Sequence, residues 1–303
     1  MAVYINNWEH YSNAYTSAEE FGDVFFTVQN ETIGSDKVRP LDEPPDLYDY
    51  IEKRGSGKKS NFTKVTSYIS KKLSKFDIPD YRMGIIMATE FGNIIDMCNL
   101  ANLAHSSPSP ISAQIFPNAT ISSATVTASI VLQAKGLNLT INSGVLSFYY
   151  ALMIAKSYIE DDKLDACIVM VGDDYNQFAM EDINTSYMEF EHFLSTINGV
   201  MLSKYKNEFS NNYIIKNVAI SSEDSIEAFL VSNTLYSCYK PCSRQLVESA
   251  LSYPCSYIGP SIAFAEIMQC LKHLKESTTS QECRVLLSDN GLVASLDIEK
   301  ETS

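Results

Sequence analysis

The pattern of apolar and polar residues predicts alternating strands and helices along most of the chain. Continuous apolar runs are typical of strands buried on both faces, and apolar residues spaced three and four apart are typical of the helices that cover them. Strands are predicted at 2–8, 82–89, 139–141, 166–171, 199–205, 213–220, 228–231, 284–287 and 292–298. Helices are predicted at 17–21, 61–76, 94–104, 118–133, 145–159, 243–251 and 261–274. This alternation indicates an α/β protein built from layers.

The same pattern divides the chain into two halves, at about 1–200 and 201–303, without a linker rich in glycine, proline or serine between them. An irregular segment is expected at 39–49, where three prolines interrupt regular structure. Because neither half has a boundary of its own, residues 1–303 are expected to form a single compact unit.

One stretch, 106–175, organises the rest of the chain. It predicts a helix of small residues, a short strand, a tight turn at 142–144, a strongly apolar helix and an apolar strand. Such a turn lies at a helix N-terminus, where free N–H groups and the helix dipole stabilise negative charge near a nucleophile. Here Val145 stands at the tip, and a valine side chain has no lone pair with which to attack a substrate.

Composition excludes several classes of function. The 303 residues are 45% hydrophobic, enough for a large core, and no apolar run reaches the length of a membrane span. The N-terminus lacks the pattern of a signal peptide, so a cytoplasmic location is expected. A net charge of −14 disfavours nucleic acid or an anionic membrane as partner, and also an acidic carrier protein docking directly on this chain. Alternatively, the charge serves solubility alone.

No cofactor or metal site is expected. The seven cysteines are interpreted as reduced core residues, and Cys238 and Cys242 have no second ligand pair with zinc spacing. The segment 55–60 resembles a phosphate-binding loop but lacks the GxxxxGK[ST] spacing and a preceding apolar strand, which favours a flexible basic loop.

Several motifs, taken in order, resemble ketosynthases of the thiolase fold. They are Phe-Pro-Asn-Ala at 116–119, Gly-Leu-Asn-Leu-Thr at 136–140, the strand with Gly-Asp-Asp at 167–174, and Gly-Val-Met-Leu-Ser-Lys at 199–204. The start of the chain, 4–8, resembles the chain-length factors that accompany bacterial type II polyketide and aryl-polyene ketosynthases. The resemblance implies a layered αβαβα fold, reduced in its second half.

The resemblance also locates the residues of the reaction, and they are absent. Val145 takes the place of the nucleophilic cysteine, and no cysteine lies between Cys98 and Cys167. Pro260 takes the place of one catalytic histidine, and the second histidine motif has no match between 205 and 256. The chain's other histidines offer no candidate base: His10 and His192 are expected at the surface, His105 in a loop and His273 in solvent.

The resemblance thus implies a non-catalytic chain-length factor that pairs with an active ketosynthase and meets an acyl carrier protein indirectly, through that partner. Interface candidates are Leu139, Thr140, Ile141, Asn142 and Phe148. Candidates for the gate that limits chain length are Ile111, Gln114, Ile115 and Phe116. Ile115 and Phe116 could equally be interface core, and Phe148 could fill the vacated pocket. Two alternatives stay open: an active acyltransferase that uses Ser143 or Ser147, and a homodimeric small-molecule binding protein.

Overall fold

The computed structural model describes residues 1–15, 17–25, 37–74, 82–106, 116–186, 190, 192–206, 212–222, 224, 234–238, 251–252, 256–277 and 282–301. Within these residues, ten strands form one sheet in the order β10-β9-β12-β13-β8-β1-β7-β5-β3-β4. The strands are β1 (Tyr4–Ser12), β3 (Met83–Ala88), β4 (Asn138–Ile141), β5 (Ala166–Asp173), β7 (Thr196–Ser203), β8 (Tyr213–Ser222), β9 (Thr234–Cys238), β10 (Leu251–Ser252), β12 (Glu282–Asp289) and β13 (Leu292–Lys300). A second, small sheet joins β2 (Val38–Arg39), β6 (His192–Leu194) and β11 (Ser256–Tyr257).

The large sheet contains the same arrangement of five strands twice. The first half has the spatial order β4-β3-β5-β7-β1 and the second half β10-β9-β12-β13-β8. When the strands of each half are counted along the chain, both orders are third, second, fourth, fifth, first. In each half, the first two pairings in this spatial order are parallel and the last two are antiparallel. The halves meet where β1 and β8 pair over two residues each. The second half, from Tyr213 to Lys300, is much the shorter, as predicted.

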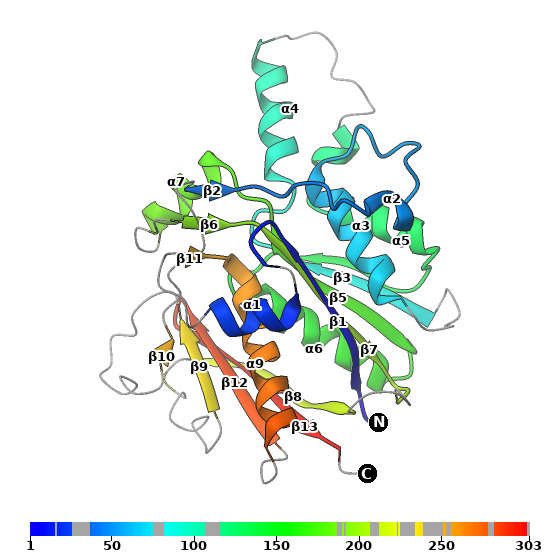
Figure 1. Ribbon diagram of the computed structural model, residues 1–303, viewed down its shortest axis with the longest axis vertical. Helices are drawn as coiled ribbons and strands as arrows, with labels where there is room; N and C mark the ends of the chain where they lie inside the picture. Colours follow the sequence, from blue (N-terminus) through cyan, green and yellow to red (C-terminus); the bar gives the residue numbers. More distant parts are fainter. Residues whose placement is uncertain are drawn as a thin grey trace.

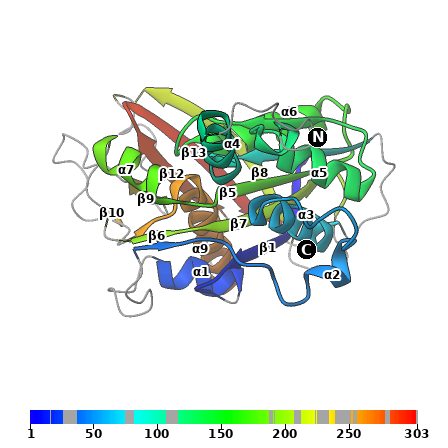
Figure 2. The same ribbon diagram turned by 90° about the horizontal axis from the view of Figure 1, so that it is seen from above.

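Helices cover the sheet in layers (Figures 1 and 2). On one face of the first half lie α3 and α5, while α6 contacts strands of both halves and also α9, which packs on β12 and β13. The helices are α1 (Ala18–Phe25), α2 (Leu47–Tyr50), α3 (Asn61–Leu73), α4 (Ile94–Ser106), α5 (Ser123–Leu132), α6 (Ser147–Glu160), α7 (Gln177–Ser186) and α9 (Ile262–Glu276). Two short 3₁₀ turns are η2 (Phe116–Ala119) and η5 (Gly259–Ser261).

Burial on both faces explains the continuous apolar runs of the central strands. On β3, Ile85 and Met87 join the core cluster under α3 and α5, whereas Ile86 and Ala88 join the core cluster around α6 and α9. All four side chains are completely buried. Each large apolar side chain buried in this way contributes about 1.5–3 kcal/mol to stability.

Most predicted elements agree with the structure within a few residues, but some differ for local reasons. The helix predicted at 118–133 is divided into η2 and α5, because the Asn118 carbonyl accepts the Asn93 and Ser123 side chains between them. The helix predicted from 145 begins at Ser147, because Gly144 adopts a left-handed φ of 58° in the turn. The segment predicted to be irregular contains β2 and α2. The strand predicted at 228–231 and most of the helix predicted at 243–251 lie outside the described residues, and the latter prediction is wrong at Leu251, which belongs to β10.

Candidate functional site

The turn between β4 and α6 is the first part of the candidate site. Asn142 and Ser143 are exposed, but the Val145 side chain is completely buried in the core around α6 and α9. Residue 145 therefore stabilises the packing between the sheet halves. Nothing at its position can form a covalent intermediate.

The Ser147 side chain hydrogen-bonds within the turn. Its Oγ accepts the Ser143 N–H at 2.8 Å and lies 2.6 Å from the Gly144 carbonyl oxygen, with the Thr89 carbonyl at 3.3 Å. The side chain is completely buried, and its contacts within the described residues include no imidazole or carboxylate that could act as a base. Because its hydroxyl proton is bound by a main-chain carbonyl, Ser147 fixes the turn and is not activated as a nucleophile.

Three carboxyl groups, the half-buried Glu90 and the buried Asp173 and Asp174, form the second part of the site. They follow or end β3 and β5, which are parallel, so all three residues lie at the carboxyl ends of these two strands. Asp173 accepts hydrogen bonds from the Thr89 hydroxyl at 2.5 Å and from the Phe91 N–H at 2.8 Å. These three residues are called the carboxyl cluster below.

Burial raises the pKa of every member of the carboxyl cluster. The pKa of Asp173 rises to about 6, although hydrogen bonds from Thr89 and three main-chain N–H groups oppose the rise. The pKa of Asp174 rises to about 7. Burial, and then repulsion from Asp173, raise the pKa of Glu90 to about 8, against the hydrogen bond that Tyr257 donates at 2.6 Å. Burial thus favours the neutral form of these carboxyl groups, most strongly at Glu90.

Pro260, at the position where the resemblance places a histidine, is buried in η5 next to this cluster. The preceding Gly259 has φ of 53°, and a Cβ built on it would lie 2.3 Å from the Tyr175 hydroxyl oxygen and 3.2 Å from Glu90 Oε2. The Tyr175 and Tyr257 rings pack at 5.8 Å in a T-shaped arrangement. Aromatic packing and carboxyl groups thus occupy the surroundings of η5, with no imidazole among the contacts described there.

The four histidines lie away from the turn. The prediction that His10 is a surface residue is wrong: it is buried, with Nδ1 2.5 Å from Asn198 Oδ1, and burial lowers its pKa to about 4. Neighbouring Glu9 does not indicate exposure, because successive strand residues face opposite sides of the sheet, and Glu9 pairs with Lys72 on the other side. His105 is exposed on the last turn of α4, not in a loop, and His273 is exposed on α9. His192 is half-buried on β6.

The predicted interface residues Leu139, Thr140 and Ile141 are half-buried on β4, at the edge of the sheet. Asn142 donates to the Glu90 carbonyl oxygen at 2.8 Å. The prediction that Phe148 lies in an interface is wrong. Its side chain is completely buried in this chain's own core and has no exposed surface that could contact a partner.

The predicted gate residues Ile111, Gln114 and Ile115 lie outside the described residues. Phe116 lies at the start of η2 and is 60% exposed.

Sequence reasoning missed the exposed apolar residues beside β4. Among the described residues, β4 pairs with β3 alone, so its outer edge is open. The helices on either side of it expose Val126 and Ile130 (71%) on α5 and Met153 on α6. We call β4 with these three side chains the β4 edge surface. Its signal in the sequence was an apolar helix face opposite the buried small residues Ala124 and Ala128.

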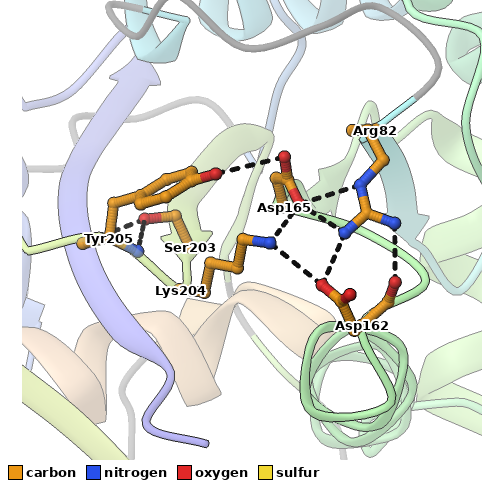
Figure 3. A network of polar contacts seen from close by, with 6 residues as sticks. All are labelled: Arg82, Asp162, Asp165, Ser203, Lys204 and Tyr205. Carbon is orange, nitrogen blue, oxygen red and sulfur yellow. Dashed lines mark hydrogen bonds and ion pairs between the residues drawn. The ribbon is translucent and has the colours of Figure 1, made fainter.

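A network of charged residues lies at the opposite ends of the same strands (Figure 3). Asp165 accepts from Arg82 at 2.5 and 2.8 Å and from Lys204 at 2.7 Å, and Asp162 bridges the same two cations. Burial alone would raise the pKa of Asp165, but the hydrogen bonds from Arg82 and Lys204 outweigh it and lower that pKa. Each charge here has a partner, so the network is structural.

The described residues contain no group of histidine, cysteine and carboxylate side chains that could hold a metal ion. Within the same residues, no helix is both long and apolar enough to cross a membrane.

Comparison with solved structures identifies the fold. One similar structure is the ishigamide ketosynthase/chain length factor, at a TM-score of 0.75 and 14% identity over 100% of both chains. A type II polyketide ketosynthase in complex with its acyl-carrier protein matches at 0.74 and 10% over 99% of both chains. The complex of the ketosynthase ApeO with its chain length factor ApeC, from Xenorhabdus doucetiae, matches at 0.61 and 12% over 99% of this chain and 100% of that one. No family model and no curated protein sequence matches.

These likenesses show that the chain has the thiolase-like fold of ketosynthases, which confirms the predicted fold class. The identities are low, so the fold is what the comparison establishes, and the activity of this chain has to be argued from its own residues.

Proposed function

We propose that this chain is the non-catalytic chain-length factor of a ketosynthase heterodimer. The observation that carries the proposal is the completely buried Val145 in the turn where the fold would present a nucleophile. Pro260, buried in η5, and Ser147, bound to main-chain carbonyls, support the same reading. A chain that keeps the fold without nucleophile or base can take part in acyl transfer only beside a subunit that has both.

The proposed partner is an active ketosynthase, which would supply the cysteine and histidines. Two of the similar structures are named as ketosynthases together with a chain length factor, and one as a ketosynthase with its acyl-carrier protein. No cofactor is needed for the role proposed here, and the assembly would work in the cytoplasm.

The β4 edge surface supports pairing with a second subunit. An open strand edge carries unpaired N–H and C=O groups, and apolar residues beside it make it prone to association. Pairing two such edges would continue the sheet across an interface and cover Ile130, Val126 and Met153. We infer that Leu139, Thr140, Ile141 and Asn142 lie in this interface.

We further propose that the gate on chain length comes from the segment that ends at Phe116. Its exposed ring is available to close a tunnel that begins in the partner. Limiting length is a steric task, because forcing extra methylenes into a packed space costs about 1–3 kcal/mol. Ile111, Gln114 and Ile115 complete this proposed gate. We also propose that residues 1–303 act as one unit, since α6 packs on strands of both halves.

Co-expression with the ketosynthase encoded beside this chain tests the proposal. The expected result is a 1:1 complex in which an acyl-carrier probe labels the partner's cysteine and leaves this chain unlabelled, as measured by intact mass. Ile130→Asp should weaken the complex, whereas Lys163→Glu, an exposed control on another surface, should not. An acylated Ser143 or Ser147 would support the acyltransferase alternative. A stable homodimer that never exchanges with the ketosynthase would support the binding-protein alternative.

A further inference from the structure

A cationic segment lies at one corner of this acidic molecule, where α2, α3 and α5 are grouped (Figure 1). Between 53 and 73 the sequence has no aspartate or glutamate, and its basic residues are Lys53, Arg54, Lys58, Lys59, Lys64, Lys71 and Lys72. Two of these, Lys64 and Lys72, form salt bridges with carboxylates of neighbouring segments at 2.6 and 2.9 Å. Four of the others lie in the loop 53–59, which we call the basic loop.

The basic loop has a fixed main chain. Ser56 is buried, and its hydroxyl donates to the Lys53 carbonyl oxygen at 2.7 Å. The Lys59 N–H donates to the Ser56 carbonyl oxygen at 3.0 Å. Gly55 takes a left-handed φ of 83°, and a Cβ added there or at Gly57 would meet no atom within 4 Å, so the tip of the loop is open. A loop ordered before binding loses less entropy when a partner docks.

Several charged side chains of the basic loop form no salt bridge with a described carboxylate. Lys53 and Arg54 are exposed and form no salt bridge in the part of the chain that the structure describes, although Lys53 lies 5.5 Å above the Tyr48 ring. The Lys59 ammonium reaches the Thr127 hydroxyl at 3.5 Å, and burial lowers its pKa. A half-buried ammonium without an anion is stabilised when a negative charge approaches.

The carboxylates that precede the loop are partly engaged elsewhere. Glu43 accepts from Lys64 at 2.6 Å, and Asp46 accepts from the Tyr68 hydroxyl at 2.9 Å. Asp49 and Glu52 remain exposed beside it. The loop is therefore a small positively charged area on a surface that also carries exposed carboxylates. Such an area favours a partner whose negative charges bind at one defined position.

The position of the loop relates it to the β4 edge surface. The Asn118 side chain of η2 donates to the Lys58 carbonyl oxygen at 3.2 Å, and Thr127, which Lys59 contacts, belongs to α5. Because α5 also presents Val126 and Ile130, the basic loop lies beside the helix that flanks the proposed interface.

We propose that the basic loop is a docking site on this chain for an acidic acyl carrier protein. The inference rests on the proposed function, since a carrier serves the heterodimer. Opposite charges at a defined spot guide encounter and fix orientation, even when the total charges of the two proteins have the same sign. The net charge of the chain alone predicted that an acidic carrier protein would not dock on it directly. The proposal revises that prediction, because the local electrostatic potential, and not the net charge, decides where an acidic protein docks.

Titration of the heterodimer with a fluorescently labelled carrier protein tests this inference. The double substitution Lys53→Glu/Arg54→Glu should weaken carrier binding about tenfold or more and flatten its dependence on salt. A matched control, Lys163→Glu/Lys216→Glu, changes net charge equally at exposed positions elsewhere and should leave binding near the unmodified level. Heterodimer content, measured by analytical ultracentrifugation, should be unchanged in both.

Unchanged carrier affinity in the loop variant, or equal weakening in the control, would overturn the docking site. Binding of a generic acidic protein as tightly as the carrier would do the same. Failure to form a heterodimer would instead count against the proposed function, and the same titration on this chain alone would then decide on the loop separately.

Discussion

The two ends of strands β3 and β5 shift the pKa values of their carboxyl groups in opposite directions. At the amino ends, Asp165 is surrounded by Arg82 and Lys204, and its pKa is lowered (Figure 3). At the carboxyl ends, the half-buried Glu90 lies near the buried Asp173, and the pKa values of both carboxyl groups are raised. Paired charges stabilise one end of the sheet, whereas the surroundings of the other end favour the neutral form of its carboxyl groups. In this fold the second end is also where the turn and η5 lie.

The largest expected effect comes from the contact between η5 and the carboxyl cluster. Gly259→Ala would place a methyl group 2.3 Å from the Tyr175 hydroxyl oxygen at a left-handed φ of 53°. We expect a loss of about 3 kcal/mol in the free energy of unfolding, measured by urea denaturation. Gly57→Ala is the control, since a Cβ there meets nothing within 4 Å. Equal stability of the two variants would show that η5 can move away from the cluster.

The second prediction concerns the paired end. Asp165→Asn would leave Arg82 and Lys204 without their buried carboxylate, and we expect a loss of about 2 kcal/mol in urea denaturation. Asp161→Asn, which removes an exposed pair with Lys163, should change the midpoint little. The lowered pKa makes the contribution of Asp165 complete above its unfolded value and lost as pH falls through the folded one. A loss independent of pH would contradict this reading.

The smallest expected effect concerns the pH dependence of stability, which should have opposite signs for the carboxyl groups at the two ends. Glu90 has a folded pKa of about 8, above its unfolded value, so the folded state binds more protons between about pH 4 and 8. Its contribution to stability is therefore complete at low pH and declines as pH rises through this range. Glu90→Gln should flatten that decline by on the order of 1 kcal/mol between pH 5 and 6, in urea denaturation at each pH. An unchanged slope would show that Glu90 is ionised in the folded protein.

The central strands could be predicted from the sequence because burial on both faces leaves a continuous apolar run. The run around Ile85 and Met87 identified β3 within a residue at each end. The turn at Val145 was located because it depends on residues adjacent in the chain. Local pattern was sufficient for both.

The rest depends on which segments become neighbours. His10 was assigned to the surface because its sequence neighbour is acidic, but β1 lies inside the sheet and Asn198 of β7 binds the imidazole. The carboxyl cluster brings Glu90 to Tyr257, residues 167 positions apart. The family resemblance pointed to residues 139–141 as an interface strand, but the exposed Val126, Ile130 and Met153 beside β4 were found only in the structure. Register and strand order are long-range properties that residue spacing does not contain.

The repeated strand order has a consequence for how such a chain can change over time. Each half alone would lose packing that the other half supplies, because α6 of the first half contacts β8, β13 and α9 of the second. Selection for a folded protein therefore acts on both copies together. A substitution in the interior of one half can therefore destabilise the other half as well.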